Sequence, residues 1–326
     1  NTLQEGGQAL LLLNRRGFAS YLACRHRACG WVLSCDQCDV TMVMHRHQDL
    51  PRGGFVRCHH CLSEQRVPRA CQACGGPVGA LGLGTQRIEE ALAKRYDTLI
   101  PGDTLRRIDS DTMRNSDDLH AALEAFGASH VKVLLGTQMI AKGLDYPGVR
   151  LVGVINADTA IHLPDFRASE RTFQLVAQVC GRCGRGNEPG TAIIQTFNPD
   201  APAIRLAAEN RYREFADAEL EDRQACGLPP SRRMVRLVIQ DRDDKRCETY
   251  AHTLRDGLIS LCDESVEIRG PIECVINRLS GRHRRQIELF SQSPHPLHHM
   301  LAEARANGLL EGADRITIDV DPISLM

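Results

Sequence analysis

The sequence lacks the features that mark membrane and secreted proteins. Its longest apolar run, Ala9–Leu13, is far shorter than the roughly 20 residues that cross a bilayer. No charged and apolar leader precedes a cleavage site, so nothing suggests secretion. Formal net charge is −1, which provides no global basic field for nucleic acid and leaves such binding to local patches.

Two further motifs are missing. The chain has neither a GxxxxGK[ST] phosphate loop nor a DExH-type box, so it carries no cradle of its own for a nucleoside triphosphate. It also begins with Asn1 rather than Met, and we therefore expect a processed chain or a segment of something longer. Internal repeats and low-complexity segments are absent too.

The bulk composition is that of an ordinary globular protein. The chain has 326 residues, of which 42% are hydrophobic and 25% charged, enough for two or three domains. Its unusual feature is a total of 14 cysteines, eight of them between Cys24 and Cys74. Composition and patterning divide the chain into residues 1–22, 23–76, 77–200, 201–230 and 231–326.

Strand and helix signals alternate in residues 77–200. Ile88, Leu92 and Tyr96 have helical spacing, and such alternation is typical of a parallel α/β sheet. Buried strands are predicted at Gln8–Leu13, Val131–Leu135, Leu151–Ile155 and Ala192–Thr196.

The last segment has a different order of elements. A charged helical stretch, Ala201–Arg223, ends at a Gly-Leu-Pro-Pro boundary. Beyond it, a β-α-β-β-α-β order predicts a small ferredoxin-like α+β domain. Its elements are expected at Met234–Gln240, Lys245–Cys262, Val266–Arg269, Arg284–Ser291, Pro296–Asn307 and Arg315–Asp319.

The clustered cysteines are spaced as metal ligands. Two CxxC pairs complete a tetrahedral site for one metal ion. Eight thiols therefore predict two structural zinc sites, because the polar loops between the pairs need such a staple to fold. The alternatives are free buried cysteines, an iron–sulfur cluster or a redox CxxC. The predicted ligands are Cys24, Cys29, Cys35, Cys38, Cys58, Cys61, Cys71 and Cys74.

One pair in this set is irregular. Cys24 and Cys29 are separated by four residues, and His26 stands in a tighter knuckle spacing to Cys29, so either Cys24 or His26 can be the eighth ligand. Trp31 follows directly, and we expect it to pack over the knuckle or to stack on a DNA base. The other histidines of this region, His45, His47, His59 and His60, are predicted to lie around the ligands or on the surface.

Two stretches carry features of nucleotide chemistry. The first, Gly136–Asp145, follows a strand with a Gly/Thr turn whose backbone N–H groups suit a phosphate; its candidate residues are Gly136, Thr137, Gln138, Gly143 and Asp145. The second contains Gln178, Arg182 and Arg185. Two arginines predicted on one helical face suit a γ-phosphate made on a neighbouring lobe. Cys180 and Cys183 also form a CxxC, but no partner pair accompanies it.

These stretches together resemble a known family. GTQMIAKGLDYPGV is similar to motif V and QVCGRCGRG to motif VI of superfamily-two helicases. NRRGFASYLAC, CGWVLSCDQCD, RCHHC, GLGTQRIEEAL, RIDSDT, LPDFRASERTFQLVAQV, LPP and DVDP match the PriA family in order. The resemblance covers essentially the whole chain. The chain differs from the family in its CxxxxC and in Cys180 and Cys183, where motif VI usually has Ala.

The resemblance implies a fold for each segment. Residues 1–22 and 77–200 are expected to form the second, RecA-like lobe of a helicase, and residues 23–76 a two-zinc insert. Residues 201–230 become a helical linker and 231–326 the C-terminal domain. Cys24 and Cys29 are implied to share one zinc ion with Cys71 and Cys74, and the inner two pairs to share the other.

The resemblance also implies an activity. It points to a 3′→5′ DNA helicase of the bacterial cytoplasm and nucleoid that recognises stalled forks and starts primosome assembly. Gln178, Arg182 and Arg185 are implied to face ATP and Mg held by a first lobe upstream of Asn1, without which the chain is expected to be inactive.

Partners follow from the same resemblance. They are forked DNA, primosome proteins with the replicative helicase loader, and the acidic tail of single-stranded DNA-binding protein. The tail is implied to bind at Arg282 and Gln286, within the basic stretch Arg278–Gln286, which otherwise reads as a solvated loop and strand face. Two alternatives remain: a zinc-ribbon adaptor without ATPase activity, and another superfamily-two translocase with a zinc insert.

Overall fold

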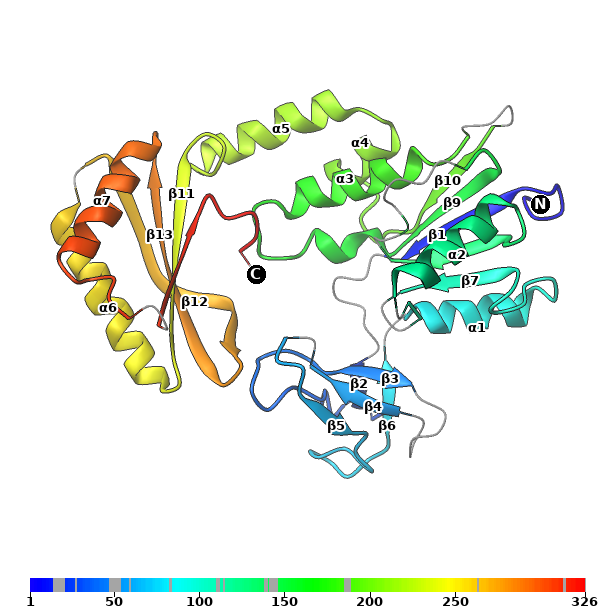
Figure 1. Cartoon of the computed structure of the whole chain (residues 1–326), viewed down its shortest axis with the longest axis horizontal. Helices are drawn as coiled ribbons and strands as arrows, with labels where there is room; N and C mark the ends of the chain where they lie inside the picture. The colour runs from blue at the N-terminus through cyan, green and yellow to red at the C-terminus, as the bar shows by residue number, and fades with distance from the viewer. Residues whose placement is uncertain are drawn as a thin grey trace. The chain divides into compact units, whose positions relative to one another are not determined.

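The computed structural model contains two compact units (Figure 1). It describes residues 1–326 except 14–20, 27, 47–53, 59, 82–83, 110–111, 114, 138–139, 141–145, 185–188, 263, 313–314 and 326. The first unit comprises Asn1–Tyr21, Ala80–Leu163 and Arg167–Ala216, and the second Leu22–Gly79, Pro164–Phe166 and Asp217–Met326.

The first unit is built on a five-stranded sheet in the order β10-β9-β1-β8-β7, in which every neighbouring pair is parallel. The continuous apolar run of β1 forms its centre, because a parallel sheet buries both faces of a central strand. The strands are β1 (Gln8–Leu13), β7 (Leu105–Ile108), β8 (Val133–Gly136), β9 (Val149–Ile155) and β10 (Thr191–Ile194).

Helices cover this sheet through two apolar clusters. Leu10 and Leu12 of β1 belong to a large core that includes Phe126 and Phe173 from two helices. Ala9 belongs to a smaller cluster on the other side of the strand, as expected when successive side chains alternate. The helices are α1 (Thr85–Arg95), α2 (Ser116–Gly127), α3 (Ala168–Cys180) and α4 (Pro202–Ala208), with a short 3₁₀ turn at Ala157–Ala160.

Asp158 ties the end of β9 to the segment that follows β10. Its carboxylate accepts hydrogen bonds from the Thr196 hydroxyl at 2.8 Å, the Phe197 amide at 2.9 Å and the Asn198 side chain at 2.9 Å. Burial alone raises the pKa of this carboxyl, but these donors outweigh burial and hold its pKa below the ordinary value. The edge strand β10 is therefore held by the Asp158 carboxylate as well as by its backbone hydrogen bonds to β9.

The strand predicted at Ala192–Thr196 exists, but the prediction that it is buried is wrong. Thr191, Ala192 and Ile193 of β10 are all exposed. A run of apolar residues with high strand propensity indicates that a strand forms. Whether the strand is buried depends on which elements cover that edge of the sheet.

The charged stretch Ala201–Arg223 forms two helices rather than one. After α4 the chain turns at Asn210, whose φ is 56°, and α5 (Tyr212–Ala225) begins beyond it. A left-handed residue ends the first helix, and Asn tolerates that conformation better than most residues.

The second unit contains the cysteine-rich insert. Its sheet has the order β5-β4-β3-β2-β6 and a small core that includes Leu22, Leu33, Met42 and Val56. The strands are β2 (Tyr21–Cys24), β3 (Val43–Arg46), β4 (Gly54–Arg57), β5 (Glu64–Arg66) and β6 (Val78–Leu81). Because β2 and β6 are neighbours, the chain enters and leaves the insert side by side.

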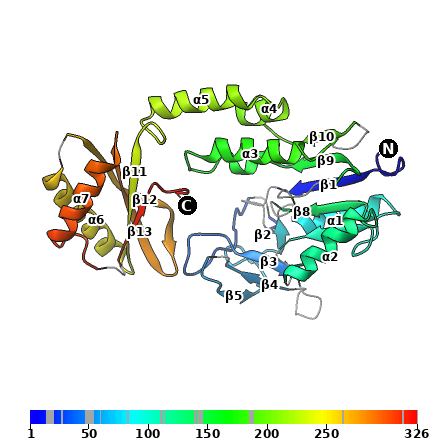
Figure 2. The same ribbon diagram turned by 45° about the horizontal axis from the view of Figure 1, so that its top comes forward.

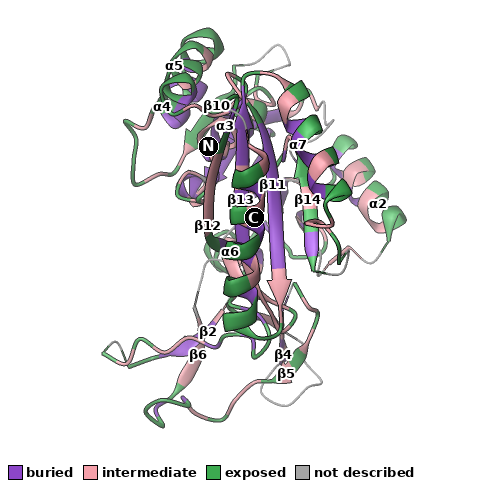
Figure 3. Cartoon of the chain, turned by 90° about the vertical axis from the view of Figure 1, so that its left-hand side faces the viewer, coloured by how far each residue is buried: buried purple, intermediate pink, exposed green. Residues whose placement is uncertain are grey.

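The second unit also contains a four-stranded antiparallel sheet in the order β12-β13-β11-β14. Both helices lie on one face of it (Figure 2), where Leu237 and Leu289 meet Leu254 and Leu301. Buried positions run along β11 and β13, and the outer helix faces are exposed (Figure 3). The elements are β11 (Arg233–Asp241), α6 (Asp244–Leu261), β12 (Val266–Leu279), β13 (Arg282–Ser291), α7 (Pro294–Ala306) and β14 (Ile316–Val320).

A helix that crosses a membrane must be both long and apolar. Over the part of the chain that the structure describes, no helix is both long and apolar enough to cross a membrane.

Candidate metal centres and nucleotide-facing motifs

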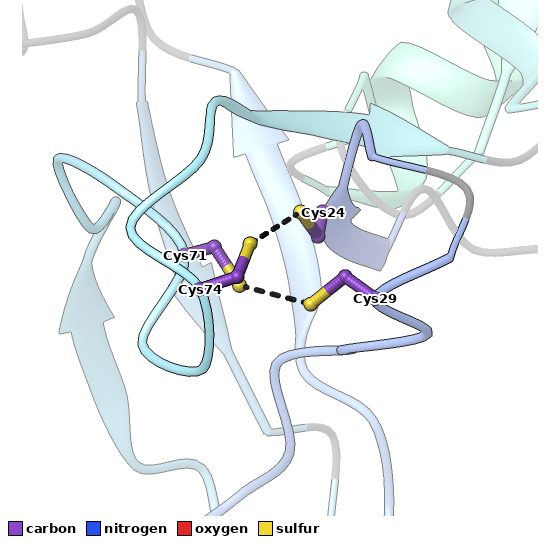
Figure 4. A group of neighbouring side chains, drawn as sticks. All are labelled: Cys24, Cys29, Cys71 and Cys74. Atoms are coloured by element: carbon purple, nitrogen blue, oxygen red, sulfur yellow. Dashed lines mark hydrogen bonds between the residues drawn. The ribbon is translucent and has the colours of Figure 1, made fainter.

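Four cysteines gather at the base of the insert (Figure 4). Cys24, at the end of β2, lies 3.5 Å from Cys74, and Cys29 lies 3.6 Å from Cys71, measured between the Sγ atoms. All four sulfur atoms lie within 4.8 Å of one another. We call this group the outer cluster. A tetrahedral zinc ion with Zn–S bonds of about 2.3 Å places its sulfurs about 3.8 Å apart, so the four thiols fit zinc.

A tight turn positions the second pair of the outer cluster. The amide of Gly75 donates to the Cys71 carbonyl at 2.9 Å, and the amide of Cys71 donates to the Gly76 carbonyl at 2.8 Å. Gly75 has a φ of +70°, a conformation that glycine adopts without steric cost. The turn therefore aims both thiols of the pair at one point.

The other four cysteines form an inner cluster of Cys35, Cys38, Cys58 and Cys61, again with all sulfurs within 4.8 Å. Three of the four are buried. Ser63, which no ligand spacing indicates, lies beside this cluster, with its hydroxyl oxygen 3.3 Å from Cys61 Sγ and 3.5 Å from Cys35 Sγ. The grouping of pairs in both clusters is the nested one that the resemblance implies.

The thiols within each cluster differ in acidity. Hydrogen bonds from Ser63 lower the pKa of Cys61 to about 6, whereas burial raises the pKa of Cys38 to about 12. Burial likewise raises the pKa of Cys24 to about 12. For Cys71, burial is outweighed by the amides of Cys74 and Ala73, which bring its pKa to about 7. A metal ion binds the thiolate form, so its binding displaces protons from the less acidic thiols.

The structure distinguishes the two candidates for the eighth ligand. Cys24 belongs to the group of four sulfurs. His26 lies at its edge, with Nδ1 3.8 Å from Cys74 Sγ, and its backbone amide donates to Cys24 Sγ at 3.4 Å. This geometry favours Cys24 as the ligand and His26 as a neighbour.

Substitution of each candidate tests this choice. We expect Cys24→Ala to lower zinc content from about two to about one ion per chain, because the outer cluster then offers three thiols. His26→Ala is expected to keep both ions. Elemental analysis of the purified variants gives the answer, and the opposite pattern assigns His26.

Trp31 packs against the small core of the insert. Its carbonyl accepts a hydrogen bond from the Cys24 amide at 2.9 Å, so the residue helps to position the backbone of Cys24. His45 stacks on Phe55 with the ring centroids 5.2 Å apart. Neither residue belongs to the two groups of cysteines.

The first nucleotide motif begins where β8 ends. A Cβ added at Gly136 lies 2.6 Å from the Ile108 carbonyl oxygen, so this glycine is required by the close approach of β7. Thr137 is buried, and its amide donates to the same carbonyl at 3.4 Å. Gln138, Gly143 and Asp145 lie outside the described residues.

The second motif straddles the end of α3. Gln178 is exposed on the helix, but the helix ends at Cys180, so the prediction that two arginines share one helical face is wrong. Arg182 lies in the turn beyond Gly181, and its amide donates to the Val179 carbonyl at 3.0 Å. Gly181 ends the helix early, because glycine is a poor helix former. Arg185 lies outside the described residues.

Cys183 belongs to the core rather than to a metal site. Its thiol donates to the carbonyls of Arg150 and Thr191, both at 3.3 Å. Burial raises the pKa of this thiol and of Cys180, which keeps both in the neutral form.

The basic stretch Arg278–Gln286 contains the end of β12, the turn of the hairpin and the first half of β13. Gln286 is buried and accepts from Arg236 Nε at 2.9 Å, while its amide donates to Glu288 at 2.8 Å. Arg285 is buried beside Asp244, with a hydrogen bond of 2.7 Å. Arg282, at the start of β13, is half-buried. The charge of Arg285 is therefore neutralised within the domain.

Comparison with known domains agrees with this architecture. Residues 84–187 match the helicase conserved C-terminal domain, and residues 224–323 match the primosomal protein N C-terminal domain. The parallel sheet and the two motifs at its strand and helix ends thus define a helicase-type lobe, joined here to a cysteine-rich insert and an antiparallel domain.

Over its whole length, the chain is similar to replication restart proteins named PriA. It is 36% identical over 329 residues to replication restart protein PriA of Bacillus subtilis, covering all of this chain and 40% of the relative. The PriA of Treponema pallidum is 36% identical, with 100% and 48% covered, and that of Haemophilus influenzae is 36% identical, with 99% and 43% covered. The chain thus spans less than half the length of these relatives.

Proposed function

We propose that the chain is the second motor lobe, zinc insert and C-terminal domain of an ATP-dependent 3′→5′ DNA helicase that recognises stalled or abandoned replication forks and initiates primosome assembly. The observation that carries this proposal is the alignment of the whole chain with replication restart proteins, on a fold whose helicase-type lobe presents Gln178 and Arg182 at one helix end.

The division of labour in ATP hydrolysis follows from what the chain holds. Gln178, Arg182 and Arg185 supply polar and guanidinium groups to a triphosphate, and the missing phosphate loop and carboxylates are supplied by a first lobe that binds ATP with Mg. Gly136, Thr137, Gln138, Gly143 and Asp145 are proposed to line the same nucleotide and DNA interface. Phosphoryl transfer depends mainly on positioning and charge stabilisation, which two lobes achieve only together.

The two cysteine clusters are proposed to hold two structural zinc ions, in a Cys₄ arrangement each. Four sulfurs without an open ligand position are typical of structural sites. The antiparallel sheet with both helices on one face supports a ferredoxin-like assignment for the C-terminal domain, because its strand order and β-α-β-β-α-β sequence are those of that fold.

ATP hydrolysis tests the proposed function. The isolated chain is expected to show no DNA-stimulated ATPase activity above background, because it has no phosphate cradle. Joined to the first lobe in the complete protein, it is expected to hydrolyse ATP when single-stranded DNA is added. A complete protein without DNA-stimulated hydrolysis favours the alternative of a zinc-ribbon adaptor, and hydrolysis without fork preference favours another superfamily-two translocase.

The proposed partners are forked DNA, primosome proteins with the replicative helicase loader, and the acidic tail of single-stranded DNA-binding protein. For that tail we propose contacts with Arg282 and Gln286; Gln286 is buried and also binds Arg236 and Glu288. Such a protein acts at the bacterial nucleoid in the cytoplasm.

The tail contact can be measured directly. Arg282→Ala is expected to weaken binding of an acidic, Phe-ended peptide by about tenfold, since a charge-assisted hydrogen bond contributes about 1.5 kcal/mol. Added salt is expected to weaken binding as well. Arg305→Ala on the exposed end of α7 is the matched control, and equal affinities of both variants in a fluorescence titration exclude the site.

A further inference from the structure

The β12–β13 hairpin ends in a tight turn. Leu279 pairs with Arg282, so the loop consists of Ser280 and Gly281, with φ values of 51° and 76°. Two consecutive residues with positive φ are typical of a type I′ turn, which suits the twist of a hairpin. Amides at such a tip usually face water and exchange their hydrogens quickly.

Here the tip amides are bonded to the inner cluster. The amide of Ser280 donates to Cys38 Sγ at 3.2 Å, and the amide of Gly281 donates to the Gln37 carbonyl at 2.8 Å. In the other direction, the amide of Asp39 donates to the Arg278 carbonyl at 2.9 Å. Three backbone donors thus join residues 37–39 of the metal knuckle to the hairpin, although about 240 residues separate them in sequence.

Side chains reinforce this contact. Arg278 Nε lies 3.3 Å from Asp39 Oδ1. Leu279 packs against the small apolar core of the insert, which includes the fully buried Cys38 and Cys58. The contact therefore combines backbone hydrogen bonds, an ion pair and apolar packing.

The outer cluster makes no comparable contact. Within the described part of the chain, the hydrogen bonds of its four thiols all stay inside the insert, to one another, to His26 and to neighbouring backbone amides. The two clusters are chemically alike, but only the inner one lies against the C-terminal domain.

We propose that the inner zinc site is a docking site for the C-terminal domain: zinc bound there holds residues 37–39 in place, and the hairpin tip binds them through the Ser280 amide and its neighbours. This inference rests on the proposed zinc occupancy. Hydrogen bonds to ligating groups commonly orient a metal site, and in this case the donor comes from a different domain. Zinc at the inner site, and not at the outer one, then controls the position of the basic hairpin.

Hydrogen exchange of the 326-residue chain tests the proposal. In the zinc-bound wild type, the amides of Ser280 and Gly281 are expected to exchange slowly for a turn. In Cys58→Ser, which removes one inner ligand, their exchange is expected to be about fivefold faster or more, since each lost hydrogen bond contributes about 1 kcal/mol. Cys71→Ser is the matched control: it removes one outer ligand and is expected to leave the tip amides protected.

Zinc content, measured on the same samples, separates this proposal from the proposed zinc sites. One outcome overturns the docking site and leaves the zinc assignment intact. In this outcome the wild type binds two ions and each variant binds one, while the tip amides exchange equally fast in all three proteins. A wild-type chain that binds no zinc overturns both.

A second variant avoids the unfolding that a ligand substitution can cause. Arg278→Asp keeps all eight thiols but opposes Asp39 across the contact, so zinc is expected to leave the inner site several-fold faster when a chelator is added. Asp39→Arg in the same chain restores the opposite charges and is expected to slow release again. Unchanged release in Arg278→Asp contradicts the proposal, and rescue by the double variant supports it.

Discussion

In the complete protein, Arg185→Ala is expected to lower ATP turnover by about 10³-fold or more, the loss typical of an arginine that stabilises a transferring phosphoryl group. The reason is the chemistry of the side chain. The chain offers arginines suited to γ-phosphate oxygens but no loop to bind the rest of the nucleotide. Steady-state ATP hydrolysis with saturating single-stranded DNA measures the effect.

Nucleotide affinity provides a second readout. ATP affinity is expected to change much less than turnover, because the first lobe holds most of the nucleotide. Arg205→Ala removes the same charge from an exposed position on α4, where it pairs with Glu209, and is the matched control. Wild-type turnover in Arg185→Ala means that the motif VI assignment is wrong.

Removal of zinc from either cluster is the other change with a large expected effect. The purified chain is expected to contain about two zinc ions, and Cys58→Ala about one, with loss of order confined to the insert and to the tip of the β12–β13 hairpin that contacts it. Binding of a structural zinc ion contributes on the order of 10 kcal/mol to folding, so the loops around an empty cluster are expected to lose their order. Elemental analysis combined with hydrogen exchange measures both consequences.

Cys247→Ala is the control for this experiment. Cys247 is also fully buried, but it lies on α6 among the apolar residues of the C-terminal domain, so its loss is expected to leave zinc content at about two. One ion or none in a folded wild-type chain contradicts the two-site model. In the complete protein, ligand variants are expected to impair DNA unwinding or partner loading more than ATP turnover.

The pattern of apolar residues predicted those helices and strands that are buried by other elements of their own domain. The apolar run Gln8–Leu13 became the central strand, and the six elements of the C-terminal domain form in the expected order. The spacing of the cysteines predicted which of them gather into the two clusters, because both thiols of a pair must reach one ion. In each case a local rule and the fold agree.

Other features depend on contacts that no local pattern encodes. The short strands of the insert carry little periodicity, and the exposure of β10 depends on neighbours beyond its own residues. The helicase motif does not indicate the end of α3 at Cys180, because Gly181 belongs to that motif and also terminates the helix. The Ser280–Cys38 contact joins distant segments, and turn chemistry predicts only the hairpin.

With zinc in both cysteine clusters, as proposed, their nested arrangement also predicts an order of folding. Cys35 and Cys61 of the inner cluster are 26 residues apart, whereas Cys29 and Cys71 of the outer cluster are 42 apart. Closing the longer loop costs only about 0.4 kcal/mol more entropy, but once the inner ion is bound, part of that loop is already ordered. The insert can then assemble from its centre outwards. The outer ion binds last and brings together β2 and β6, the strands by which the insert joins the rest of the chain.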